Sequence, residues 1–68
     1  MNEVIFVVKE VPEGGFVARA LDAPIFTTAR DAISLHAQLR DAVRCHFENE
    51  QVPQHIRLHF VRDEVIQV

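Results

Sequence analysis

Four histidines and one cysteine are the residues of this chain whose types could bind a metal ion or act as a nucleophile. Cys45 and His46 are adjacent, and neighbours on a helix project about 100° apart, so they do not form a ready catalytic dyad. His55 and His59 share one face of a predicted strand but lie about 13 Å apart, too far to bind one ion. We therefore expect no metal site, a partly buried structural thiol at Cys45, and histidines on the surface or facing a partner.

The remaining polar residues show no catalytic motif either. Asp22, Asp63 and Glu64 are isolated carboxylates, and Glu13-Gly14-Gly15 lacks the pattern of a phosphate-binding loop that leads from a strand into a helix. The sequence has no dinucleotide-binding fingerprint, no Walker sequence and no nucleophile elbow, and a cofactor enzyme needs more chain around its cofactor than this one has. We expect a protein that is not an enzyme and binds no cofactor.

Length and composition indicate one small globular domain over residues 1–68. Apolar residues make up 49% of the chain and charged residues 25%, which is ordinary for a folded domain. A core of this size is only marginally stable alone, so we expect a homodimer or a higher homo-oligomer. The net charge of −3 disfavours direct binding to nucleic acid and suits a basic protein partner.

The single cysteine and the N-terminal residues bear on the compartment. Cys45 has no second cysteine with which to form an intramolecular disulfide, and small secreted domains usually depend on such bonds. The chain begins without a basic region, and its first apolar run is too short and too strand-like for a signal peptide or a membrane span. We expect a cytoplasmic protein.

The first half of the chain predicts a three-stranded meander. Residues 4–8 are continuously apolar and rich in β-branched side chains, as in a central strand covered on both faces. Gly14-Gly15 can take the positive φ angles of a tight turn, and residues 16–21 alternate as a second strand. Residues 25–28 have the β-branched and aromatic content of a third strand.

The second half predicts one amphipathic helix and a fourth strand. Asp31 is a suitable N-cap, and apolar residues recur at helical spacing as far as Phe47. Residues 50–54 end the helix and turn the chain, and residues 56–60 alternate as a strand. Residues 65–68 are either an extension of that strand after a bulge or a separate short edge segment. The predicted fold is α+β, a βββαβ antiparallel sheet with one helix packed on one face.

One helix covers one sheet face, so the other face of the predicted sheet stays open. It keeps apolar side chains, and such a patch usually marks an interface. We expect a homodimer through this open face or through the strand edges. The polar candidates for partner binding on the same face are Arg19, Arg57 and His59, and the alternative is an ordinary solvated strand face. The apolar residues expected there are Ile5, Val7, Val17 and Val61.

Three segments resemble the HicB-like antitoxin family: Gly-Gly-Phe-Val-Ala at 14–18, Ala-Pro-Ile-Phe-Thr-Thr at 23–28, and residues 31–43. In that family a glycine-led second strand, a short third strand ending in threonine, and an acidic, alanine-containing helix follow in this order. The resemblance implies a βββαβ fold similar to a partial ribonuclease-H-like core. It also implies neutralisation of a small mRNA-cleaving HicA-type toxin, by masking of its nuclease surface and commonly by a homo-oligomer.

The sequence departs from the family pattern at three points. Pro24-Ile25 stands where the family often has Gly-Cys, and the helix begins without the usual run of glutamates. Full antitoxins commonly carry a DNA-binding segment after this domain, and none follows Val68, so we do not expect transcriptional autoregulation by this chain alone. The alternative function is a homo-oligomeric structural or ligand-binding module of the same fold with no toxin partner.

Overall fold

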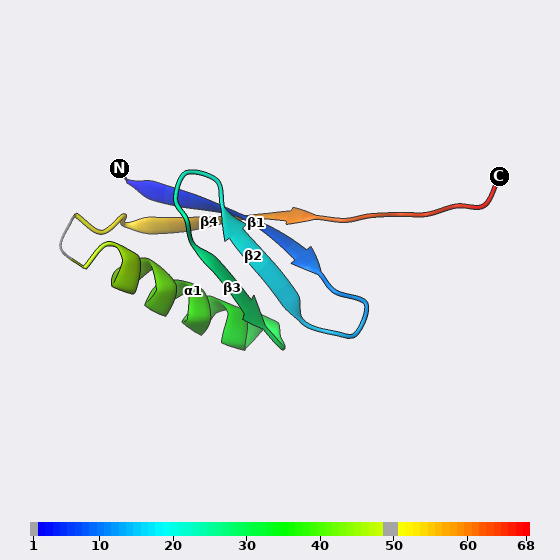
Figure 1. Cartoon of the computed structure of the whole chain (residues 1–68), viewed down its shortest axis with the longest axis horizontal. Helices are drawn as coiled ribbons and strands as arrows, with labels where there is room; N and C mark the ends of the chain where they lie inside the picture. The colour runs from blue at the N-terminus through cyan, green and yellow to red at the C-terminus, as the bar shows by residue number, and fades with distance from the viewer. Residues whose placement is uncertain (1, 49–50) are drawn as a thin grey trace.

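The computed structural model describes residues 2–48 and 51–68, which form a sheet with one helix packed on one face (Figure 1). The elements follow in the order βββαβ, which confirms the predicted α+β class. Their bounds are β1 (Glu3–Glu10), β2 (Phe16–Ala20), β3 (Phe26–Ala29), α1 (Ala32–His46) and β4 (His55–Val61).

The strands lie side by side in the order β3-β2-β1-β4, so β1 is an interior strand as predicted, although only its α1 side is buried and not both faces. β1 with β2 and β2 with β3 are antiparallel, which gives the predicted meander. β4 pairs with β1 in parallel, so the sheet is mixed and not wholly antiparallel as we predicted. The reason is the helical connection, because α1 carries the chain back along the sheet before β4 begins, as a parallel crossover requires.

Gly14 and Gly15 close the hairpin between β1 and β2. Both have positive φ, at 101° and 96°, which confirms the predicted turn. The amide of Gly14 donates to the carbonyl of Val11 over 2.9 Å, and the amide of Val11 donates to the carbonyl of Gly15 over 3.1 Å. A Cβ on Gly15 would lie 2.6 Å from the carbonyl oxygen of Ala29, so Gly15 also allows the hairpin to pass close to the end of β3.

Asp31 begins α1 as predicted. Its side chain accepts a hydrogen bond of 2.7 Å from the amide of Ser34, which is the usual N-cap contact. This hydrogen bond is the main reason that the pKa of Asp31 is lowered from its ordinary value of 3.8. The helix ends at His46, and the turn predicted over residues 50–54 begins outside the described residues.

The core lies between α1 and one face of the sheet. Leu35 and Leu39 of α1 are almost fully buried against Phe6 and Val8 of β1, so the helical spacing identified the packed face correctly. Burial of side chains of this size is the main source of stability in a domain this small. The other buried apolar residues are Val4, Ala18, Ala20, Ile25, Val43 and Phe47.

Residues 62–68 are assigned to no strand. They run on from the end of β4 and project beyond the sheet, where Figure 1 shows them in orange and red. They form neither the strand extension nor the separate edge strand that the sequence left open. We refer to residues 62–68 as the C-terminal segment.

Candidate protein-interaction site

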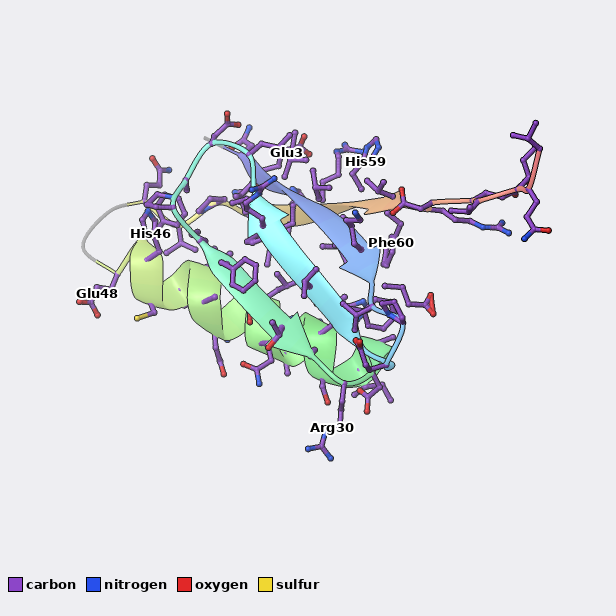
Figure 2. The ribbon with its side chains drawn as sticks, turned by 45° about the vertical axis from the view of Figure 1, so that its right-hand side comes forward. Glu3, Arg30, His46, Glu48, His59 and Phe60 are labelled. Carbon is purple, nitrogen blue, oxygen red and sulfur yellow. The ribbon has the colours of Figure 1, made fainter. Side chains whose placement is uncertain are left out.

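The sheet face opposite α1, called here the open face, carries the three residues predicted for partner binding. Phe6 and Val8 are fully buried under α1, so Val7 between them points to the open face. The strand register sets Val7 opposite Arg19 of β2 and opposite His59 of β4. Arg19, Val7 and His59 therefore form one row across three neighbouring strands, and His59 projects away from α1 in Figure 2.

Arg57 lies on the same face, opposite Ile5 of β1. Its Nε donates to both carboxylate oxygens of Glu3, at 3.2 and 3.1 Å. This hydrogen bond, followed by the attraction of the carboxylate charge, raises the pKa of Arg57 above its ordinary value. Because the pair is largely exposed, it contributes little to stability, and its main effect is to orient the guanidinium.

Apolar side chains separate these charges on the open face. Ile5, Val7 and Val17 are half-buried, and Val61 is exposed at the end of β4. Phe26 of β3 lies opposite Arg19 and is 64% exposed. The sequence did not identify Phe26 as a candidate, because its face depends on the register between β2 and β3, which the short connection between these strands sets.

A second surface feature is a groove of about 410 Å³ between α1 and β4, on the helix side of the sheet. It is called here the α1–β4 groove. Its apolar lining comes from buried residues of α1, from residues 52–53 and from half-buried residues of β4, and it includes exposed cationic residues of α1. The apolar residues are Leu39, Val43, Val52, Pro53, Ile56 and Leu58, and the cationic ones are Arg40 and Arg44.

The cysteine and the four histidines are all exposed. Cys45 is exposed, which corrects the expected partly buried thiol. Its position explains the exposure, because Cys45 follows the buried Val43 by two residues, about 200° around the helix. Within residues 2–48 and 51–68, no three His, Cys, Asp or Glu side chains are grouped to hold a metal ion. No helix in this part of the chain is long and apolar enough to cross a membrane.

These features define a class, a small α+β sheet domain with an open face that mixes apolar, cationic and histidine side chains. The chain is 33% identical over 67 residues to a UPF0150 protein of Thermotoga maritima, and the matched residues cover 98% of this chain and 94% of that relative. It is 45% identical over 54 residues to a UPF0150 protein of Archaeoglobus fulgidus, and the matched residues cover 79% of this chain and 80% of that relative. The chain belongs to the UPF0150 family. No family model and no solved structure matches it.

Proposed function

We propose that this chain is a non-catalytic, cytoplasmic protein-binding domain that acts as an antitoxin. It would bind a small, basic, mRNA-cleaving toxin of the HicA type and mask its nuclease surface. The observation that carries this proposal is the open face, where Arg19, Val7 and His59 lie in one row across three strands. The resemblance of the strand and helix segments to HicB-like antitoxins supplies the identity of the partner.

The composition of the open face suits contact with a protein. Protein interfaces combine an apolar centre with a polar rim and are enriched in Arg and in aromatic side chains. Ile5 and Val7 supply the apolar centre, and Arg19, Arg57 and Phe26 supply side chains of the enriched types. The net charge of −3 attracts a basic partner over distance, which raises the rate of association.

The test is co-expression with the product of the neighbouring small basic reading frame, followed by co-purification and a growth assay. We expect the wild-type chain to bind that product and relieve its toxicity. The Arg19→Ala variant should bind at least tenfold more weakly, because truncating an arginine that anchors an interface costs more than about 1.4 kcal/mol. Among the described residues no ion pair involves Arg19, so the substitution breaks none of them.

The matched control is Arg30→Ala. Arg30 is exposed in the connection from β3 to α1 and projects away from His59 in Figure 2. This variant loses the same side chain and charge as Arg19→Ala and should bind like the wild type. If the neighbouring product is neither toxic nor bound, the antitoxin role is wrong. If both variants weaken binding equally, the open face is not the binding surface.

A second candidate function is a homo-oligomeric structural module that has this fold and no toxin partner. The observation that favours it is the exposure of apolar residues in the C-terminal segment, where Val65 is 92% and Ile66 78% exposed. A genome neighbourhood without any small basic reading frame, together with stable self-association of the purified chain, would support this second function over the first.

A further inference from the structure

The C-terminal segment exposes apolar side chains beside a sheet edge that is free to pair. Among the described residues β4 has a neighbouring strand on one side only, so the other edge presents unpaired backbone amides and carbonyls. Such an edge is a template for an added strand. The α1–β4 groove lies along this edge, and Ile56 and Leu58 of β4 line it while still half-exposed.

We propose that the C-terminal segment of one copy adds to the β4 edge of a second copy as an antiparallel strand. The second copy returns its own segment in the same way, so the dimer is symmetric and closed. The apolar side chains of each segment then fill the α1–β4 groove of the other copy. This inference does not depend on the antitoxin role, because it uses the sheet edge and the helix side of the sheet, and not the open face.

Symmetry restricts the register of this pairing. When a two-fold axis relates two antiparallel strands, it stands perpendicular to the sheet, so directly opposite residues share a face. Ile56 and Leu58 face the groove, and Ile66 and Val68 have the same parity along the chain. The register that sets Ile66 opposite Leu58 also sets Val68 opposite Ile56. It places Arg62 opposite the same residue of the second copy, on the axis.

The length and the charge of the C-terminal segment agree with its binding at the β4 edge of a second copy. The C-terminal segment and β4 have the same number of residues and each span about 23 Å as strands, at about 3.3 Å per residue. Glu64 has the parity of Ile66 and therefore lies on the side of the sheet that carries α1. There Arg40 and Arg44 flank the groove, so the charge of Glu64 is opposite to that of these arginines, while Arg62 on the same side faces only its own counterpart at the axis.

The structure also favours binding of the C-terminal segment to a second copy over binding to the α1–β4 groove of its own chain. The segment leads away from the body of its own chain, as Figure 1 shows. Near its start, Asp63 forms an ion pair with Lys9 at the end of β1, with 3.3 Å between Oδ2 and Nζ. A segment held in this direction is presented to another molecule. Folding back onto its own β4 would require a reversal close to the point where this ion pair is made.

The first test is analytical ultracentrifugation of the full chain and two matched variants, Ile66→Asp and Val65→Asp. We expect a wild-type dimer. Ile66→Asp should raise the dimer dissociation constant at least 30-fold, because it places a carboxylate in an apolar groove. Val65→Asp makes a comparable change on the other side of the segment and should raise the constant less than threefold. Both residues are exposed in the single chain, so neither variant should alter its circular dichroism.

A wild-type chain that stays monomeric at about 0.5 mM would overturn the proposal. This concentration is far above the dissociation constant of a modest complex, which is about 1 μM. A dimer that is weakened equally by the two variants, or by neither, would overturn the groove as its site. The charge contact has a separate test. Arg40→Glu should weaken the dimer, and the double variant Arg40→Glu with Glu64→Arg should restore it. Failure of this rescue would refute the assigned partner charges.

The register is tested by a cysteine on the axis. In a Cys45→Ser background, Arg62→Cys should form a disulfide-linked dimer under mild oxidation, because residues opposite on antiparallel strands lie within disulfide range. Asp41→Cys, on the exposed side of α1, is the control and should not cross-link. A dimer in which the two cysteine variants cross-link equally, or neither does, would refute the register. Toxin binding by Ile66→Asp should be unchanged, so the two proposals can fail independently.

Discussion

Gly15→Ala tests the close approach between the β1–β2 hairpin and the end of β3. Gly14 and Gly15 have nearly the same φ, at 101° and 96°, so alanine at either position costs about 1–2 kcal/mol in backbone strain. About 0.4–1 kcal/mol of this is offset by the lower entropy of the unfolded chain. The two positions differ in their surroundings. A Cβ on Gly14 meets nothing within 4 Å, whereas one on Gly15 would lie 2.6 Å from the carbonyl oxygen of Ala29.

Relief of that contact requires a backbone shift, which costs about 1–3 kcal/mol by analogy with overpacked cores. We therefore expect Gly14→Ala to lower the free energy of unfolding by about 1 kcal/mol and Gly15→Ala to lower it by about 2–4 kcal/mol. In a domain of this size, each 1 kcal/mol corresponds to about 4–8 °C in Tm. The assay is urea unfolding followed by circular dichroism, at one fixed protein concentration because self-association adds to apparent stability. Equal losses in the two variants would refute the close-approach argument.

Three further predictions concern the cap, the core and the surface ion pair. Asp31 has a lowered pKa in the folded chain, so its contribution to stability is complete above pH 3.8 and is lost as the pH falls through the lower folded value. Asp31→Asn keeps an N-cap side chain that does not titrate. In acid-unfolding curves, the difference in stability between this variant and the wild type should therefore change only below pH 3.8. Leu39→Ala removes a fully buried side chain and should cost about 2–5 kcal/mol in urea unfolding, and a loss below about 1 kcal/mol would contradict its core position. Arg57→Ala removes an exposed ion pair and should shift Tm by less than about 3 °C in a thermal melt.

The parts of the fold that sequence predicted well are those set by local chemistry. The glycine pair, the Asp31 cap and the apolar spacing of α1 each specify a conformation within a few residues, and all three are present. The predicted direction of β4 relative to β1 was wrong, because this direction depends on where α1 returns the chain and not on any property of residues 55–61. Alternation within β4 still placed Arg57 and His59 on the same face as Arg19, since the side-chain period holds for either direction. Their role in partner binding stays a prediction.

The α1–β4 groove and the exposure of Phe26 on the open face could not be predicted from the sequence, for a related reason. Both depend on long-range placement, of α1 relative to β4 in one case and of β3 relative to β2 in the other. The exposure of Cys45 has a different origin. Free cysteine is commonly buried, but its place on α1 lies away from the stripe that ends in Val43 and Phe47, and residue type does not override that geometry.

The two proposed surfaces are compatible, because they lie on different parts of the sheet. Strand addition at the β4 edge uses the free edge and the groove beside α1; it leaves Arg19 and Val7 exposed and sets Val65 of the second copy beside His59 at the end of the row. A two-fold axis perpendicular to the sheet keeps the open faces of both copies on the same side. The dimer would thus present two equivalent binding faces side by side. A toxin bound to each gives a 2:2 assembly, whereas Ile66→Asp should yield 1:1 complexes of the same intrinsic affinity.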